Sequence, residues 1–459
     1  MHRIGIIGGG FSGIMLAVQL LNSEALRPCS LHLIEASQIG GGVAYSTNVD
    51  AHILNIPAAN MSAFPDDPLH FVRWAERKVE GGLPITFHRR AVYREYLQEL
   101  LVQSERQNFS KCTLHRMGQR VTAIVPSGEG YRLLFARHVP IFFDQVVLAM
   151  GHYPPAPLPQ LTSPSRNYVH DIWKDPWVEE IGKNDAVFIL GTGLSMVDIV
   201  RQLQAMGHQG QIHALSRHGF VLQNRKSLLE VNCVAFADQM LNEAIADESP
   251  IFLPQSYQFF KELPREVSSI LRMAREEIAE VAKVGVHENC VISGILQHVG
   301  QRIDEWPMEI QQRFLRHLGR RARSWLYGYP QESADVVERL RETQQLQCHK
   351  GMLDSVRPVG DTIVVQIRDQ RELRVRWVFN CTGPAQRLQD IADPLIQQLH
   401  RDGLIRPDAW GNLLEASSGG AVRPGMWCVG PVKKDPYTRN NTVPQLRRAV
   451  KKLADTLSK

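Results

Sequence analysis

Three glycines near the start of the chain have the spacing of a turn that binds phosphate. Gly8, Gly10 and Gly13 follow the apolar run Arg3–Ile7 and precede a helical pattern. Gly8 permits a tight turn, Gly10 lets backbone N–H groups approach a pyrophosphate, and Gly13 lets the helix pack closely on a sheet. The start of that helix, with Ser12 in its first turn, presents unpaired N–H groups and a partial positive charge. The segment therefore predicts a dinucleotide site.

An acidic residue ends the next apolar run. Glu35 follows Leu31–Ile34, at about the 20-residue offset at which a carboxylate accepts hydrogen bonds from an adenosine ribose. The flanking strand and helix patterns and this acid favour dinucleotide binding. An ordinary glycine-rich turn between a strand and a helix is the alternative.

A second strand–turn–helix pattern begins with the apolar run Ala186–Leu190. Its turn residues are Gly191, Gly193 and Ser195. Met196 stands at the third glycine position, which is a departure from the pattern. The following strand pattern leads to Arg217, whose guanidinium could pair with a 2′-phosphate. We therefore expect NADPH rather than NADH, with a solvated surface arginine as the alternative.

Composition and charge are those of an ordinary globular protein. The 459 residues are 44% hydrophobic and 22% charged, and the formal net charge is +5. This small charge argues against extended binding to a nucleic-acid backbone, so no nucleic-acid partner is expected. No apolar run reaches the roughly 18 residues of a membrane span. We expect no membrane span and no secretory signal, and hence a cytoplasmic location.

The seven cysteines contain no C-x-x-C pair. A thioredoxin-like dithiol and a structural zinc site both rely on such pairs, so the sequence predicts neither of them and no metal. This argues against the disulfide reductases that use such a pair. Most of the cysteines are expected to be small buried hydrophobic residues.

The chain is expected to be α/β, with two Rossmann-like dinucleotide-binding domains and a helical insert. Residues 1–160 would form the first part of one domain, 161–224 a segment of the other, 225–345 the insert, and 346–459 the remaining strands with a return to the first domain. The long loop after Glu35 is rich in Gly, Pro, Asn and Ser, and loops of this length commonly serve a site. Helical patterns lie near 68–80 and 90–104, and strand patterns include 120–125, 131–136, 141–149, 362–367 and 373–379.

Taken together, these segments resemble the FAD-NAD(P)-binding family of two-dinucleotide flavoproteins, which is related in layout to class B flavin monooxygenases and amino-acid N-hydroxylases. The resemblance covers nearly the whole chain. It rests on residues 8–13, 42–47, 54–58, 61–65, 190–198 with 216–219, and 380–384. Late in the insert, residues 320–330 keep arginines and aromatics but not the order that the family usually shows. This departure leaves the substrate open.

The resemblance implies FAD on the first turn and NADPH on the second. For FAD it implies Gly8, Gly10, Ser12, Gly13 and Glu35, with Asn55, Met61 and Ser62 against the flavin ring and the backbone of Val121 at the adenine. The strand exits at Gly151 and Gly430 join this set, as do Asn441, Thr442 and Val443, where a helix start could stabilise negative charge on reduced flavin. For NADPH it implies Gly191, Gly193, Ser195 and Arg217.

The activity implied is that of an NADPH-reduced monooxygenase that hydroxylates the nitrogen of a small amine or amino acid. Its partners would be O2 and a small-molecule substrate, either an anion or an amino acid. An NADPH-dependent reductase that passes electrons to a quinone or protein stays open, as does a non-catalytic redox-sensing flavoprotein. The chemistry needs no protein nucleophile, and no catalytic residue is assigned. Candidate bases are His52, His88 and His152.

Other clusters could bind an anion or shape a substrate pocket. Arg89, Arg90 and Tyr93 could bind a carboxylate or phosphate, or form a solvated helix face. A second cluster that could bind an anion comprises Lys433, Lys434 and Arg439. The insert is expected to take part in substrate selection through Trp306, Arg320, Arg321, Arg323, Trp325, Tyr327 and Tyr329, against the alternative of helix core and solvated arginines. The oligomeric state is not predicted.

Overall fold

The computed structural model describes residues 2–79, 82–174, 176–217, 306–317, 328–385, 387–408, 420–431 and 442–459, with single positions at 219, 272, 275, 276, 279 and 411. It divides into two compact units. The first unit comprises Met1–Glu180, Thr382–Lys434 and Arg439–Lys459, and the second comprises Ile181–Cys381 with Asp435–Thr438. The chain thus leaves the first unit and returns to it. The domain boundaries at residues 160, 224 and 345 stay predictions.

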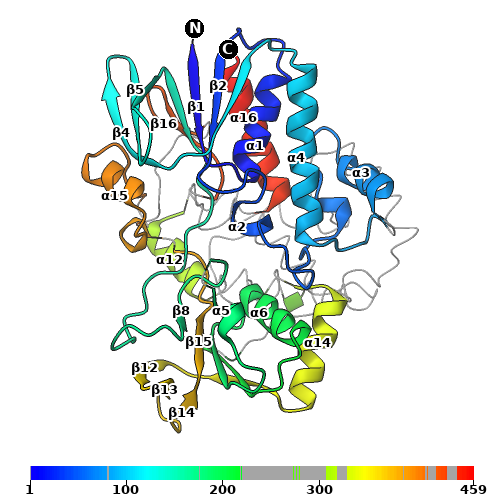
Figure 1. Ribbon diagram of the computed structural model, residues 1–459, viewed down its shortest axis with the longest axis vertical. Helices are drawn as coiled ribbons and strands as arrows, with labels where there is room; N and C mark the ends of the chain where they lie inside the picture. Colours follow the sequence, from blue (N-terminus) through cyan, green and yellow to red (C-terminus); the bar gives the residue numbers. More distant parts are fainter. Residues whose placement is uncertain are drawn as a thin grey trace. The chain divides into compact units, whose positions relative to one another are not determined.

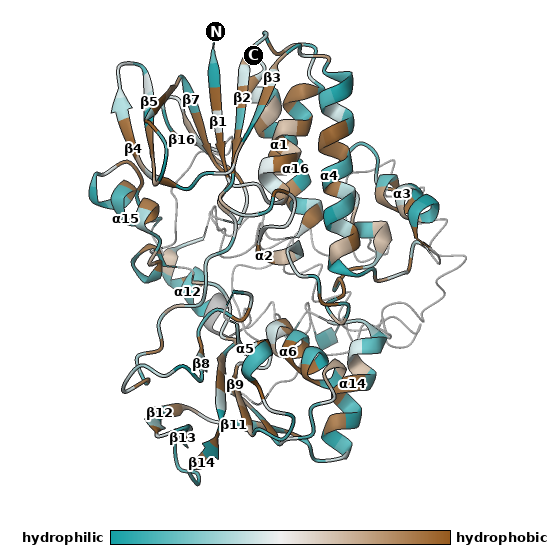
Figure 2. Ribbon diagram, in the orientation of Figure 1, coloured by the Kyte–Doolittle hydropathy of each residue, from teal (hydrophilic) through white to brown (hydrophobic). Residues whose placement is uncertain are grey.

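A six-stranded sheet forms the centre of the first unit, in the order β16-β17-β7-β1-β2-β3 (Figure 1). Its strands are β1 (Arg3–Ile7), β2 (Ser30–Ile34), β3 (Thr113–Met117), β7 (Gln145–Leu148), β16 (Ala421–Arg423) and β17 (Met426–Cys428). Every neighbouring pair is parallel except β16 and β17. At the centre of the sheet, β1 and β7 are apolar after their first residue (Figure 2), because both faces of a parallel sheet are covered.

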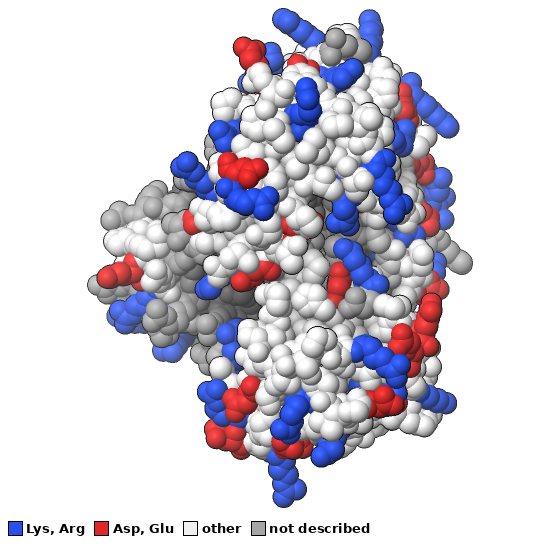
Figure 3. Space-filling model, turned by 60° about the vertical axis from the view of Figure 1, so that its left-hand side comes forward, with Lys and Arg blue, Asp and Glu red and all other residues white. Residues whose placement is uncertain are grey.

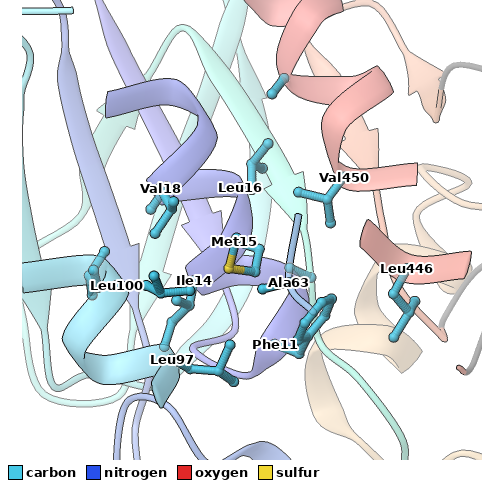
Figure 4. Packing of buried hydrophobic residues seen from close by; sticks show 14 of the residues in the cluster. Phe11, Ile14, Met15, Leu16, Val18, Ala63, Leu97, Leu100, Leu446 and Val450 are labelled. Atoms are coloured by element: carbon cyan, nitrogen blue, oxygen red, sulfur yellow. The ribbon is translucent and has the colours of Figure 1, made fainter. Parts of the chain in front are cut away.

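Three helices pack together beside this sheet. They are α1 (Phe11–Leu21), α4 (Arg90–Gln107) and α16 (Val443–Leu457). In Figure 4, Ile14 of α1 lies beside Leu97 and Leu100 of α4, while Leu16 lies toward Val450 of α16. Each fully buried side chain of this kind contributes roughly 1.5–3 kcal/mol. The helix that follows the first glycine turn is therefore anchored by the largest core of the unit.

A second core lies under an antiparallel sheet, β4-β5-β6, and helix α15. The elements are β4 (Val121–Ser127), β5 (Gly130–Phe135), β6 (Ile141–Phe143) and α15 (Pro394–Arg401). Asp393 caps α15 by accepting hydrogen bonds from two backbone N–H groups of its first turn. Gln398 of α15 bonds to both the N–H and the C=O of Ile124, at 3.0 and 3.1 Å. This contact joins segments 274 residues apart.

One predicted strand proves to be two. The pattern over 141–149 divides into β6 and β7, which belong to different sheets, with Asp144 between them. Asp144 accepts a hydrogen bond from the N–H of Arg3 at 2.7 Å, and its own N–H donates to the Arg3 carbonyl at 3.0 Å. Apolar periodicity cannot show this change of sheet. The other elements of the unit are α2 (Gly42–Tyr45), η1 (Ala58–Asn60), α3 (His70–Lys78), β8 (Tyr168–Val169), α5 (Trp177–Glu180) and η4 (Leu388–Asp390).

The second unit contains parallel strands in the order β11-β10-β9-β15. Its elements are β9 (Val187–Leu190), α6 (Leu194–Ala205), β10 (Ile212–Ser216), α12 (Met308–His317), α14 (Gln331–Glu342), β11 (Leu346–Lys350), β12 (Leu353–Val359), β13 (Thr362–Ile367), β14 (Leu373–Val375) and β15 (Trp377–Asn380). The pattern over 373–379 again divides, at Arg376, because β14 joins the antiparallel β12-β13-β14 sheet while β15 joins the parallel one. The expected α/β class with two nucleotide-type folds is confirmed.

Only part of the expected helical insert lies within the described residues. There α12 and α14 are helical, as expected for 225–345. The helical patterns at 263–283 and 292–303 lie outside the described residues apart from four single positions. No helix among the residues that the structure describes is long and apolar enough to cross a membrane. On the face shown in Figure 3, acidic and basic side chains are interspersed.

Candidate dinucleotide-binding sites

The backbone of the first turn requires glycine at two positions. Gly8 has φ +112°, and its N–H donates to the carbonyl of Ile34 at 2.8 Å. A Cβ on Gly8 would lie 2.3 Å from the Ala149 carbonyl oxygen, and one on Gly13 would lie 1.9 Å from the Gly8 carbonyl oxygen. Both distances are far below contact. Gly8 and Gly13 therefore allow strand, turn and helix to pack.

Gly10 differs, because the folded chain would tolerate a side chain there. It is the N-cap of α1, with φ −78° and no side-chain cap. A Cβ would meet only Gly42, at 3.4 Å from its Cα. The first N–H groups of an α-helix have no partner within the helix. An uncapped helix start beside a residue without a side chain fits an approaching pyrophosphate.

Glu35 is tied to the same turn. One carboxylate oxygen accepts a hydrogen bond from the N–H of Gly9 at 2.8 Å, and the other accepts two from the N–H and hydroxyl of Ser37, at 2.9 and 2.8 Å. These bonds hold the carboxylate at the carboxyl end of β2. An ionised carboxylate has about four acceptor positions, so capacity remains for a ribose hydroxyl.

The end of β17 also lies at this turn. A Cβ on Gly430, which has φ +104°, would lie 2.8 Å from the hydroxyl oxygen of Ser12. This places the end of β17 against the start of α1. Val121 belongs to the same buried cluster as Ile7 and Ile34, the last residues of β1 and β2. Gly151, at φ +73°, follows β7, and a Cβ placed on it would meet no atom within 4 Å.

The loop after Glu35 is held from within. The side chain of Ser62 is fully buried, and its hydroxyl donates to the carbonyls of Phe64 and Asp67. Met61 is also buried, whereas Asn55 is half-buried. The Ser62 hydroxyl therefore stabilises the loop, and only the backbone groups of Ser62 would face a flavin.

Two arginines of α4 organise this loop, and the sequence analysis missed one of them. Arg94, only 8% exposed, donates to the carbonyls of Tyr45, Ser46 and Thr47 and to the side chain of Asn48, at 2.8–3.4 Å. Arg90, four residues earlier on the same helix face, donates to the carbonyl of Ile53 at 3.1 Å. Their i, i+4 spacing was the available signal.

The proposed cluster of Arg89, Arg90 and Tyr93 is divided by the structure. Arg89 is exposed and pairs with Asp50 at 2.7 Å. Arg90 is buried, and its guanidinium lies over the Trp173 ring at 5.2 Å. Tyr93 is fully buried. A solvated helix face, the alternative weighed for this cluster, is therefore wrong for Arg90 and Tyr93.

Buried polar atoms without partners lie near the start of α1. The Tyr93 hydroxyl and the Nε of Arg447 have no hydrogen-bond partner among the described residues. Tyr93 stacks on Phe11, the first residue of α1, and Arg447 donates through Nη1 to the Ser62 carbonyl at 3.0 Å. Burial raises the pKa of Tyr93 well above its usual value. Both groups therefore offer hydrogen bonds that a polar ligand could accept.

The start of α16 offers fewer free donors than expected. Thr442 caps the helix through a capping box with Gln445. Pro444 has no N–H, and that of Gln445 bonds to Thr442. Among the three proposed residues, Val443 therefore retains the first-turn N–H, while Asn441 lies outside the described residues.

The second turn repeats the geometry of the first. Gly191 has φ +117°, and its N–H donates to the Leu215 carbonyl at 2.8 Å. Gly193 is the uncapped N-cap of α6, with φ −89° and ψ −166°, close to the −78° and −165° of Gly10. Nothing lies within 4 Å of a Cβ on Gly193. Met196 is fully buried at the third glycine position and does not alter the turn.

The strand end beyond this turn carries two cations. Arg217 is exposed and follows β10 directly. In the register of β10 and β11, Ser216 pairs with Lys350, which is also exposed. The buried hydroxyl of Ser216 has no hydrogen-bond partner among the described residues. A hydroxyl and two cations together suit a phosphate monoester. Lys350 was not among the predicted site residues, because the sequence pattern did not predict strand β11.

The candidate bases have different surroundings. His52 is buried, with Nδ1 2.8 Å from the Thr47 hydroxyl. Its ring meets Trp173 edge-on at 5.4 Å. His88 packs edge-on against Phe71, and burial lowers its pKa. His152 is half-buried. The contacts of His52 and His88 are those of packed residues.

Of the residues expected to form a substrate pocket, two are described. Trp306 and Tyr329 are 7% and 3% exposed, so both are buried, although they lie just before α12 and α14 rather than within a helix. Arg320, Arg321, Arg323, Trp325 and Tyr327 lie outside the described residues, as do Lys433, Lys434 and Arg439.

Comparison with known proteins gives one family match, in the first part of the chain. Residues 5–153 match the family described as FAD-NAD(P)-binding. None of the curated protein sequences compared with the chain matches it. Among solved structures, an ornithine N-hydroxylase from Kutzneria sp. 744, with reduced FAD, NADP+ and L-ornithine, aligns at TM-score 0.59 and 14% identity, covering 100% of this chain and 99% of that one.

Two further structures align over similar lengths. An L-lysine 6-monooxygenase from Pseudomonas syringae has TM-score 0.59 and 14% identity, covering 100% of this chain and 99% of that one. A bacillithiol disulfide reductase from Bacillus cereus has TM-score 0.51 and 12% identity, covering 100% and 98%. At these identities the likeness shows the fold, which is that of the two-dinucleotide flavoproteins.

The family match and the fold confirm the resemblance drawn from the sequence. Residues 5–153 form an FAD-NAD(P)-binding domain. The whole chain has the fold of the two-dinucleotide flavoproteins, and its activity is proposed below. The role of each residue at the two turns is a proposal developed below.

Proposed function

We propose that this protein is an NADPH-dependent FAD monooxygenase that hydroxylates the nitrogen of a small amine or amino acid. The observation that carries the proposal is the pair of matching glycine turns, each with an uncapped helix start, on a fold shared with N-hydroxylases over the whole chain. Two such turns suit an enzyme that uses both a flavin and a reductant.

The first turn would hold FAD. Gly10 and the first N–H groups of α1 would face the pyrophosphate, Glu35 the ribose, and the backbone of Val121 the adenine. Met61, the backbone of Ser62 and the N–H of Val443 would lie toward the flavin ring. Bound FAD supplies a two-electron acceptor and, once reduced, reactivity toward O2.

The second turn would hold NADPH. Gly193 and the start of α6 would face its pyrophosphate, and Gly191 and Ser195 complete the turn. Ser216, Arg217 and Lys350 would bind the 2′-phosphate. A guanidinium and an ammonium both favour a phosphate dianion over the hydroxyl of NADH. This arrangement supports a preference for NADPH.

The chain's own residues would orient the substrate and exclude water. A neutral amine can act as the nucleophile, so no protein nucleophile is required. As the sequence predicts, the loop after Glu35 and the helical insert would each contribute to substrate selection. If the insert selects the substrate, Arg323→Ala and Tyr327→Ala should reduce the response to the substrate while flavin reduction by NADPH continues.

The experiment is a screen of small amines and amino acids with the FAD-bound protein, NADPH and O2. At least one compound should stimulate both NADPH oxidation and O2 uptake and should yield an N-hydroxylated product by mass spectrometry. If every compound leaves the rates unchanged and all O2 is recovered as hydrogen peroxide, monooxygenation is refuted.

The reductase is a second candidate, favoured by the likeness to a bacillithiol disulfide reductase. The chain lacks a C-x-x-C pair, so electrons would pass directly from flavin to an acceptor. Rapid anaerobic turnover of NADPH with a quinone, without product formation in air, would favour this function. If NADPH and NADH both fail to reduce the bound flavin, the redox-sensing alternative is favoured.

A further inference from the structure

Two buried cysteines, far apart in the sequence, meet at the opposite end of the first sheet from the glycine turn. Cys29 precedes β2 and Cys112 precedes β3, and their side chains are 1% and 2% exposed. Their Sγ atoms are 2.9 Å apart, although 83 residues separate them in sequence. Cys29 also donates through its N–H to the Sγ of Cys112 at 3.2 Å.

The strand register already places the two backbones at the spacing of a disulfide. Ser30 pairs with Thr113 in the parallel β2–β3 ladder, so Cys29 and Cys112 stand opposite each other one position earlier. The N–H of Thr113 donates to the Cys29 carbonyl at 2.9 Å. Neighbouring strands lie about 4.8 Å apart, within the roughly 4.4–6.8 Å between Cα atoms that a disulfide spans. The sulfurs need to approach by about 0.9 Å to reach a bond of about 2.05 Å.

The surroundings favour Cys112 as the attacking thiol. Hydrogen bonds from the Cys29 thiol and the Ser110 hydroxyl lower the pKa of Cys112, although burial opposes them. The same contact raises the pKa of Cys29. The two cysteines lie close to the protein surface, because their chain neighbours Pro28 and Lys111 are exposed.

We propose that Cys29 and Cys112 form a redox-sensitive dithiol that hydrogen peroxide converts to an intrachain disulfide. The Cys112 thiolate attacks one peroxide oxygen, the O–O bond breaks, and one water leaves after proton uptake, which gives a sulfenic acid at Cys112. The Cys29 sulfur then attacks the Cys112 sulfur, and its thiol proton leaves with the hydroxyl as a second water. In total two thiols are oxidised and one peroxide is reduced to two waters.

The pair is separate from electron transfer at the flavin site. Six residues of extended chain from Cys29 to Glu35 span about 20 Å. Oxidation would instead join the turn before β2 to the turn between α4 and β3. Hydrogen peroxide is a by-product whenever reduced flavin reacts with O2 without transferring oxygen, so the enzyme class itself can supply the oxidant.

The test uses the reduced, FAD-bound protein treated with hydrogen peroxide and then alkylated and digested. Mass spectrometry should find a peptide pair joined through Cys29 and Cys112, at the mass of two hydrogen atoms less than the two thiol peptides. The disulfide should raise the Tm by roughly 5–10 °C, because it closes a long loop in the unfolded chain, and dithiothreitol should reverse the shift.

Cys29→Ser and Cys112→Ser should abolish both the joined peptide and the Tm shift, whereas Cys348→Ser, at a half-buried cysteine on β11, should leave both unchanged. If a serine variant fails to fold, the peptide map of the parent protein still decides. The proposal is overturned if both thiols are alkylated after peroxide treatment, if Cys112 is found only as sulfinic acid, or if either cysteine pairs with a different one.

Discussion

Replacing Gly10 with alanine should separate dinucleotide binding from folding. The added Cβ would lie 3.4 Å from the Cα of Gly42, an ordinary contact, and φ −78° suits any L-residue. The FAD-free protein should therefore lose no more than about 3 °C in Tm. The methyl group would stand where the pyrophosphate approaches. Loss of one charge-assisted hydrogen bond, worth about 1.5–3 kcal/mol, raises the Kd for FAD roughly ten- to hundredfold.

Gly13→Ala is the matched control on the same turn. Its Cβ would lie 1.9 Å from the Gly8 carbonyl oxygen. Since such contacts are not found below 3.0 Å, helix and turn must separate by 1.1 Å, the difference between 3.0 and 1.9 Å. Overpacking of this kind costs about 1–3 kcal/mol, and at the upper limit the Tm of the FAD-free protein falls by about 6 °C or more.

Calorimetric titration of the FAD-free proteins and their thermal unfolding decide between these effects. Gly10→Ala should change the Kd and spare the Tm, whereas Gly13→Ala should lower the Tm before any FAD is added. If Gly10→Ala binds FAD like the parent protein, or unfolds as early as Gly13→Ala, the division of roles among the glycines is refuted.

Three further predictions concern the second turn, the loop and acid stability. Arg217→Ala and Lys350→Ala should each lower kcat/KM for flavin reduction by NADPH roughly tenfold or more and leave that for NADH unchanged; equal losses with both nucleotides in stopped-flow reduction would contradict this. Arg94→Met should lower the free energy of unfolding by about 2–3 kcal/mol in urea titrations, because the loop carbonyls lose their hydrogen-bond donor. An unchanged free energy of unfolding would refute the proposed role of Arg94 in holding the loop. Burial, and to a smaller extent the neighbouring His349, lower the pKa of His213 from 6.5 to about 4. The neutral ring therefore stabilises the fold fully above pH 6.5. This contribution, about 1 kcal/mol after solvent screening, is lost as the pH falls from 6.5 toward 4. His213→Gln should flatten the Tm profile in that window, and an unaltered slope would count against it.

The glycine turns could be predicted from the sequence because each is local. Gly8 and Gly191 adopt similar positive φ values, +112° and +117°, and each donates a 2.8 Å hydrogen bond to the neighbouring strand. The glycines, strand and helix of each turn lie within about 20 residues. The sequence predicted the start of α16 less completely. It left the backbone N–H groups of the first turn free to face a flavin, whereas the capping box of Thr442 and Gln445 uses some of them.

Other features depend on tertiary placement and could not be predicted. Asp144 and Arg376 lie where the chain changes sheet, and apolar residues occur on both sides of each break, so the pattern does not show the change. Lys350 comes beside Ser216 only through the β10–β11 register. Likewise, the absence of a C-x-x-C pair argued against a thioredoxin-like dithiol only, and the contact of Cys29 with Cys112 depends on the β2–β3 register.

The most direct test of monooxygenation is the fate of isotope-labelled O2 during turnover with NADPH and an amine that stimulates the enzyme. We expect one labelled oxygen atom in the N-hydroxylated product and the other in water, with product formed in step with NADPH oxidised. Recovery of all label as hydrogen peroxide, with the amine unmodified, would contradict the proposed function.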